Sequence, residues 1–233
     1  MTADRALEEI AFAGPEHLDP AYVAGYDRKA QVDPTDDVAG LRARGIGRTS
    51  TVIDFGAGTG TFAVAAAAIC ERVIAVDVSP AMVNALRTKV TASGVTNVEC
   101  VVGGFLSYAH EGAPVAAVYT RNALHHLPDF WKGIALGRIA HLLEPGGILR
   151  LRDLVFSFDL GEARARVAEW IATTAAGRPE DGWTREELET HLRDEYSTFS
   201  WLLEPMLDRA GFDVVDAEYG PLGAYAAYTC VRR

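Results

Sequence analysis

Three glycines at alternating positions, Gly56, Gly58 and Gly60, follow a short apolar run that contains one acid, Asp54. The β-branched and aromatic residues at 51–55 predict a buried strand, and the glycines let the chain turn tightly and approach a ligand with no Cβ in between. A helix is expected directly after this turn, so its free N–H groups and positive dipole end would face the same spot. This arrangement suits a nucleotide-like cofactor.

The glycine loop alone fits two cofactor classes. Residues 58–63 also match the dinucleotide pattern G-x-G-x-x-A. A second acid, Asp77, ends the apolar run 73–77 about twenty residues beyond the glycines, where a carboxylate can accept hydrogen bonds from both ribose hydroxyls. The spacing therefore predicts a ribose but leaves the rest of the cofactor open, and a tight turn without any ligand is the third alternative.

The order of the predicted elements is that of an α/β fold. Apolar runs that predict buried strands alternate with segments that predict helices, which favours a mostly parallel sheet covered on both faces. The last two predicted strands, 212–219 and 224–231, are joined by only four residues, so they must be antiparallel. A helix that begins after Pro128 is expected to present Phe130 and Ile134 on its apolar face.

Charge and composition limit the classes of molecule that the chain is expected to bind. The 233 residues carry a formal net charge of −10, with lysine at only three positions. Since no basic stripe is present, we expect no nucleic-acid partner and favour a small-molecule substrate. Residues 1–12 lack a basic region followed by an apolar run, and no apolar segment approaches ~18 residues, so we expect a soluble cytoplasmic protein without membrane contact. The oligomeric state cannot be derived.

The three cysteines lie in apolar contexts. Cys70, Cys100 and Cys230 are few and odd in number. Buried free thiols are therefore expected, and neither disulfides nor metal ligands.

Two motifs together resemble those of one family. Asp54-x-Gly56-x-Gly58-x-Gly60 resembles motif I of the class I S-adenosylmethionine-dependent methyltransferases, which hold the methionine part of their cofactor with this loop. Leu124-His125-His126-Leu127-Pro128-Asp129 resembles a segment that lines the cofactor and the substrate in small-molecule members related to quinone-biosynthesis enzymes. The resemblance covers residues 52–153 and 212–231.

The resemblance implies an α/β, Rossmann-like, seven-stranded and doubly wound sheet that is mostly parallel with an antiparallel last strand. Residues 1–50 would form an N-terminal helical lid segment, and 51–155 the cofactor-binding core. Residues 156–200 would form a helical insertion after the fifth strand that acts as a substrate lid, and 201–233 the end of the core.

The resemblance also implies which residues hold S-adenosylmethionine (SAM) and its product, S-adenosylhomocysteine (SAH). Asp54 and the glycines would hold the methionine end, and Asp77 the ribose. Relatives often place an aspartate for adenine where this chain has Gly104, so the backbone N–H and the ring of Phe105 are expected to contact adenine instead. The expected cofactor residues are Tyr26, Asp54, Gly56, Ala57, Gly58, Gly60, Asp77, Val78, Met82, Gly104, Phe105, Arg121 and Asn122.

Methyl transfer is a displacement at a sulfonium carbon, so alignment of the acceptor contributes most of the catalysis. A general base is needed only for a hydroxyl or a protonated amine, and His126 is the first candidate, with His125 or the region of Asp153 and Tyr196 as alternatives. His125, Arg152, Asp153 and Tyr196 are candidate substrate contacts, although Arg152 could instead form an internal ion pair. No metal site is expected, because adjacent helical side chains point about 100° apart and no third ligand is evident.

Two alternatives to a methyltransferase remain. An NAD(P)-dependent short-chain reductase would explain the dinucleotide pattern, but the Tyr-x-x-x-Lys typical of that class is absent, because Gly25, Ala85 and Pro128 precede the three lysines by four positions. A non-catalytic cofactor-binding protein with the methyltransferase fold stays open, because catalysis by alignment leaves no obligatory side-chain signature.

Overall fold

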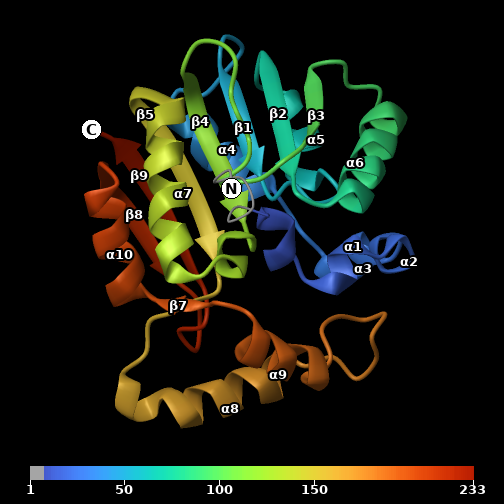
Figure 1. Cartoon of the computed structure of the whole chain (residues 1–233), viewed down its shortest axis with the longest axis vertical. Coiled ribbons are helices and arrows are strands. Elements are labelled where there is room, and N and C mark those ends of the chain that lie inside the picture. Colours follow the sequence, from blue (N-terminus) through green and yellow to red (C-terminus); the bar gives the residue numbers. More distant parts are fainter. Residues whose placement is uncertain (1–7) are drawn as a thin grey trace, which may run out of the picture.

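The computed structural model describes residues 8–233 and is built around one sheet of seven strands (Figure 1). The strands are β1 (Thr51–Phe55), β2 (Arg72–Asp77), β3 (Val98–Val102), β4 (Val115–Arg121), β5 (Leu143–Asp153), β8 (Phe212–Tyr219) and β9 (Ala226–Arg232). Their order is β3-β2-β1-β4-β5-β9-β8, and β9 runs antiparallel to both of its neighbours. The prediction of a mostly parallel sheet with an antiparallel last strand is confirmed.

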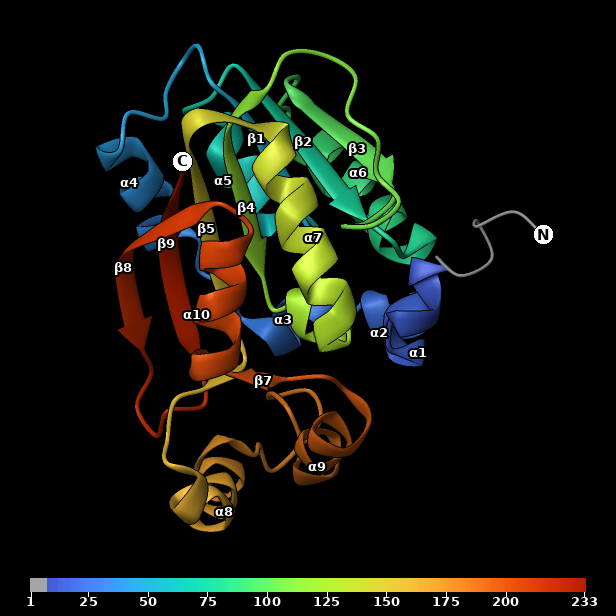
Figure 2. The same cartoon turned by 60° about the vertical axis from the view of Figure 1, so that its left-hand side comes forward.

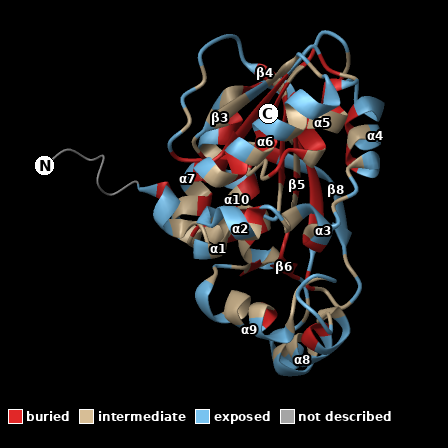
Figure 3. Cartoon of the chain, turned by 90° about the vertical axis from the view of Figure 1, so that its right-hand side faces the viewer, coloured by how far each residue is buried: buried red, intermediate tan, exposed pale blue. Residues whose placement is uncertain are grey.

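Helices cover both faces of the sheet. The helices in these two layers are α4 (Thr35–Ala43), α5 (Thr61–Ala67), α6 (Pro80–Ser93), α7 (Asp129–Leu142) and α10 (Ser200–Arg209). Successive strand residues point to opposite faces, so Ile53 packs in one core with α7 and α10, and Val52 packs in a second core with α4, α5 and α6. Figure 3 shows the buried residues concentrated in the strands between these helix layers.

Short helices precede the sheet. They are η2 (Glu9–Phe12), α1 (Pro15–Leu18), α2 (Pro20–Val23) and α3 (Tyr26–Ala30). Asp19 caps α2 by accepting a hydrogen bond from the N–H of Ala21, as the Asp19-Pro20 pair predicts. Residues 1–7, on which the prediction of a missing leader partly rests, lie outside the described residues. Within residues 8–233, no helix is both long enough and apolar enough to cross a membrane.

A segment after β5 leaves the main sheet. It contains β6 (Val155–Phe156), η4 (Leu160–Glu162), α8 (Ala163–Thr174), α9 (Arg185–Asp194) and β7 (Thr198–Phe199). β6 and β7 pair in parallel, which holds the two ends of the segment together, and Trp170, Ile171 and Leu188 form a small core of their own. Figures 1 and 2 show α8 and α9 beyond the end of the sheet, away from the helix layers.

The structure bears on two further predictions, the state of the cysteines and the apolar face of α7. Cys70, Cys100 and Cys230 are free, as predicted, although Cys100 is only half-buried. On α7, the expected burial of Phe130 and Ile134 is wrong, since they are 70% and 39% exposed. Lys132 is buried instead, because its Nζ donates to the carboxylate of Asp129 and to the backbone carbonyl of Tyr196.

Candidate active site

Two adjoining cavities lie beyond the carboxyl ends of β1 and β4, where the strand order reverses and α/β folds usually bind ligands. The larger cavity has a volume of about 760 Å³ and extends from the glycine loop to α9. The smaller one, of about 90 Å³, lies beside the residues that follow β2 and β3. Tyr26, Gly58 and His126 line both, so the cavities meet at the glycine loop.

The glycines of the loop have different roles. Gly56 has φ +67°, and a Cβ there would lie 2.2 Å from the Cβ of Ala123. At Gly60, where φ is +87°, a Cβ would lie 2.0 Å from Cδ1 of Leu86. Gly56 and Gly58 line the cavities, whereas Gly60 lies against Leu86 of α6 and outside the two linings, and its cofactor contact stays a prediction.

The two acids predicted to bind the cofactor are both buried. Asp54 is 2% exposed and its Oδ2 has no hydrogen-bond partner. Burial, and then the charge of Asp77, raise the pKa of Asp54 well above its ordinary value. Asp77 accepts hydrogen bonds from the N–H groups of Gly58 and Ser79, both 2.8 Å long, but burial still raises its pKa to about 6. A positively charged ligand would compensate this pair of carboxylates.

An acid that the sequence did not single out lies beside Gly104. Glu9 is 5% exposed and lines the smaller cavity. Its Oε2 accepts hydrogen bonds from the N–H groups of Leu106 and Ser107 and from the Ser107 hydroxyl, at 2.9–3.1 Å. A Cβ at Gly104 would lie 2.4 Å from the Glu9 carboxyl group, so the missing side chain makes room for this carboxylate. No local pattern could have revealed a contact between such distant parts of the sequence.

The other residues expected beside adenine also line the smaller cavity. Val78, Met82 and Phe105 belong to its lining, and the Phe105 ring stacks on Phe55 at a centroid distance of 5.1 Å. Arg121 and Asn122 line both cavities. The structure thus places the expected cofactor residues around the two cavities, except Gly60.

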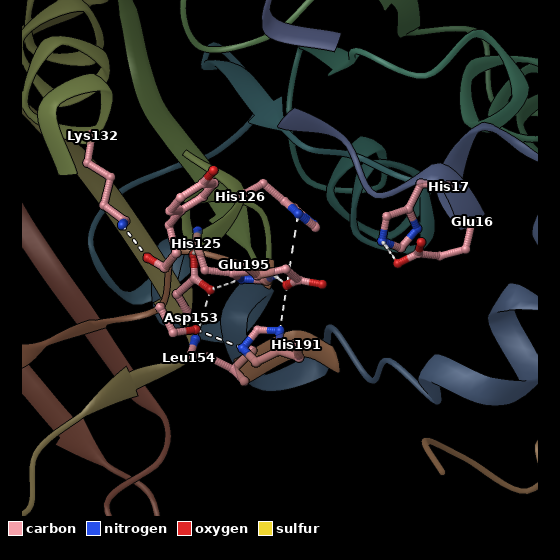
Figure 4. Close-up of polar contacts among 11 residues, drawn as sticks. Glu16, His17, His125, His126, Lys132, Asp153, Leu154, His191 and Glu195 are labelled. Carbon is pink, nitrogen blue, oxygen red and sulfur yellow. Dashed lines mark hydrogen bonds and ion pairs between the residues drawn. The ribbon is translucent and has the colours of Figure 1, made fainter. Parts of the chain in front are cut away.

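A cluster of histidines and acids lines part of the larger cavity, and Figure 4 shows its polar contacts. His125 and His126 lie on the short helix η3 (Leu124–His126). The Nδ1 of His125 lies 2.5 Å from Oδ1 of Asp153, and its Nε2 lies 2.9 Å from Oε2 of Glu195. The same oxygen of Glu195 lies 2.5 Å from Nδ1 of His191.

The pKa values of the two adjacent histidines are shifted in opposite directions. Burial alone would lower the pKa of His125, but Asp153 and Glu195 outweigh burial and raise the pKa to about 9. Burial, and then the charge of His125, lower the pKa of His126 to about 3. Burial would raise the pKa of Glu195, but His125 and His191 hold it well below its ordinary value. At neutral pH, His126 is therefore the uncharged member of the pair.

Among the four candidate substrate residues, only His125 lines the larger cavity. Asp153 lies behind His125 and fixes its ring. Arg152 forms an ion pair with Asp37 at 2.8 Å, which is the alternative that the sequence left open. Tyr196 is 44% exposed and its ring packs edge-on against Phe12.

The expectation that no third ligand accompanies the two adjacent histidines is wrong. A third potential ligand does accompany the adjacent histidines, because one donor atom of His125, one of His126 and one of Glu195 lie within 4.8 Å of one another. Glu195 comes from the end of α9, so the local spacing around the histidines could not show it.

The N-terminal helices and the segment after β5 meet over the larger cavity. Lys29 forms an ion pair with Glu187, and its Nζ lies 4.8 Å from the ring centroid of Trp183. Tyr26 packs edge-on against the same tryptophan. These contacts join the first and last thirds of the chain across the cavity mouth.

Known proteins resemble this chain in sequence and in fold. Residues 52–147 match the family described as "Methyltransferase domain". An uncharacterized methyltransferase from Exiguobacterium sibiricum is 30% identical over 171 residues, which cover 73% of this chain and 72% of the relative. Ribosomal protein L11 methyltransferase from Dechloromonas aromatica is 31% identical over 59% of this chain, which spans only 43% of that relative's length.

A solved structure supports the fold. Magnesium protoporphyrin IX methyltransferase from Synechocystis PCC 6803, with bound SAM, superposes with a TM-score of 0.58 at 18% identity, over 85% of this chain and 77% of that one. The strand order, the acid-and-glycine loop and the similarity over most of the Exiguobacterium protein agree with one another. The chain belongs to the class I S-adenosylmethionine-dependent methyltransferases.

Proposed function

We propose that the chain transfers the methyl group of SAM to a small-molecule acceptor in the larger cavity. The observation that carries this proposal is Asp54, which lines the larger cavity together with Gly56 and Gly58 and whose buried Oδ2 has no hydrogen-bond partner among residues 8–233. An unpaired buried carboxylate is unfavourable, and the ammonium group of a bound methionine moiety would pair it. The residues present therefore fit the cofactor of the family.

The two cavities divide the cofactor between them. The backbone of Gly56, Ala57 and Gly58 would face the methionine end, and Asp77 would accept the ribose hydroxyl protons. The adenine would lie in the smaller cavity, where Oε1 of Glu9, which has no hydrogen-bond partner among residues 8–233, can accept a hydrogen bond from the amino group. This assigns to Glu9 the role that the sequence gave to the backbone of Phe105.

SAM supplies a methyl group that its sulfonium already activates. The protein's own contribution is to align the acceptor, since a well-oriented bound pair reacts far faster than free reactants. During transfer the sulfur–methyl bond breaks as the acceptor–methyl bond forms, and the electron pair stays on sulfur. An acceptor that loses a proton could give it to His126, which is uncharged and lines both cavities, but the pKa of about 3 makes this histidine a weak base, so alignment of the acceptor has to supply most of the rate.

Several observations favour a small acceptor. The larger cavity holds about 760 Å³, a volume in the range of pockets that bind small molecules. The chain also carries ten net negative charges, which opposes binding to a nucleic acid. Family membership contradicts the short-chain reductase alternative.

A substrate screen tests the proposal. Purified protein is incubated with methyl-labelled SAM and a panel of small hydroxyl, amine and thiol compounds, and both labelled product and SAH are measured. We expect transfer to at least one class, with loss of transfer in Asp54→Asn. Tight SAH binding without turnover on any compound would contradict catalysis and favour the non-catalytic alternative.

A further inference from the structure

The histidine cluster contains the donor set of a transition-metal site. His125, His126 and Glu195 each offer one donor atom, and these atoms lie within 4.8 Å of one another. Two imidazole nitrogens with a carboxylate oxygen suit a first-row divalent ion, which binds imidazole at about 2.0–2.1 Å. Mg²⁺ and Ca²⁺ prefer oxygen ligands, so nitrogen donors disfavour them.

The donors are held by a second layer of side chains. Asp153 bonds Nδ1 of His125, which leaves Nε2 of that ring directed at Glu195. Metal-binding histidines typically make such a bond to a carboxylate through the ring nitrogen that does not bind the metal. His191 holds the Glu195 carboxylate at 2.5 Å, and Ser197 fixes the other nitrogen of His191 at 2.8 Å.

One of the potential ligand atoms, Nδ1 of His126, is unpaired among the described residues. Nδ1 of His126 is buried and has no hydrogen-bond partner, and it lies 3.9 Å from Oε2 of Glu195. That gap is too long for a hydrogen bond but is close to the separation of two ligands that share one ion. A cation between the two atoms would pair both.

We propose that His125, His126 and Glu195 bind one divalent first-row transition ion such as Zn²⁺, with Asp153 and His191 as positioning residues. All three residues line the larger cavity, so a molecule in that cavity would lie beside an ion that they bind. This is the arrangement of catalytic sites, in which the open position takes water or substrate.

The ion gives the proposed methyl transfer a defined acceptor chemistry, and this second step rests on the proposed function. A hydroxyl or thiol that coordinates the ion loses its proton more readily, and the resulting anion attacks the methyl group. The proton leaves to solvent, the acceptor–methyl bond forms and SAH departs with the sulfur electron pair. In the loaded protein, His126 is a ligand and no longer the base.

Metal binding is measured directly, without substrate. The full chain is stripped with a chelator and titrated with Zn²⁺ by equilibrium dialysis, and with Co²⁺ by visible absorption. We expect one ion per chain, and a loss of at least about tenfold in affinity in Glu195→Gln and in His126→Ala. His141→Ala is the matched control, because His141 is exposed and lies outside both cavities, and it should bind as the parent does.

SAH calorimetry on the same preparations separates the two proposals. Circular dichroism and urea denaturation of Glu195→Gln and His126→Ala, compared with the parent, show whether both variants are folded. Absence of stoichiometric Zn²⁺ binding, or equal affinity in both variants and the parent, would overturn the metal site even if SAH binds. Site-dependent Zn²⁺ binding without SAH binding would support the metal site and contradict the proposed function.

Discussion

At the level of single residues, ionisation of the Asp77 carboxyl group should make cofactor binding depend on pH. Its pKa of about 6 is raised by burial, and Asp54, Glu9 and Tyr26 are the other titratable groups near it. The ribose hydroxyls donate to the ionised carboxylate, so SAH affinity should be full above about pH 7 and fall as pH drops through 6, by up to about tenfold per unit. SAH titrations between about pH 5 and pH 8 check this.

Asp77→Asn is the companion variant. Its amide does not ionise, so SAH should bind more weakly than to the parent at neutral pH, and the affinity should depend less steeply on pH between pH 5 and pH 8, with Asp54 as the remaining titrating carboxyl group. An unchanged pH profile in this variant would show that another group controls the binding.

Glu9 should determine which base the smaller cavity accepts. Its Oε1 accepts a hydrogen bond from the adenine amino group in our proposal, whereas hypoxanthine would present a carbonyl oxygen to the same carboxylate. The parent should therefore bind SAH at least about tenfold more tightly than S-inosylhomocysteine, the hypoxanthine analogue. Glu9→Gln should largely lose this preference, because an amide can also donate, and equal discrimination in parent and variant would contradict the assignment.

At the level of elements, the side chain of Asp37 anchors α4 to strands β4 and β5. Its side chain is fully buried, pairs with Arg150 at 3.0 Å and Arg152 at 2.8 Å, and accepts a hydrogen bond from the Tyr119 hydroxyl. Asp37→Ala would leave two partly buried guanidinium groups without this partner, which should lower the free energy of unfolding by about 3–5 kcal/mol. Urea denaturation measures the change.

The neighbouring residue gives the control. Asp36 lies in the same helical turn but is exposed, so Asp36→Ala should cost less than about 1 kcal/mol. Equal losses in the two variants would indicate that the charge of the helix start matters and the buried ion pair does not.

Features that depend on local sequence could be predicted, and features that depend on distant contacts could not. Ser79, Pro80 and Gly94 mark the ends of α6, and the sequence alone predicts these ends because caps and a left-handed glycine act within a few residues. Lys132 is buried where Phe130 is exposed, because its partner is the carbonyl of Tyr196 in a remote segment. The role of Glu9 and the contact between Glu195 and His125 could not be predicted for the same reason.

At the level of the whole molecule, the cavity is enclosed by segments from opposite ends of the chain. Lys29 and Tyr26 from the N-terminal helices meet Trp183 and Glu187 across its mouth. Bound SAH should stabilise this closed arrangement, so amide hydrogen exchange should slow in both α3 and the start of α9. Lys29→Ala should reduce the protection of α9, while α8, outside these contacts, should exchange alike in parent and variant.

The central claim is that Asp54 and the adjoining cavities bind SAM through its charged methionine end. Calorimetric titration of the purified chain with SAH, and separately with NADH, tests it most directly. We predict binding of one SAH per chain, no binding of NADH, and at least about tenfold weaker SAH binding in Asp54→Asn. Binding of NADH without SAH, or SAH affinity unaffected by Asp54→Asn, would contradict the account.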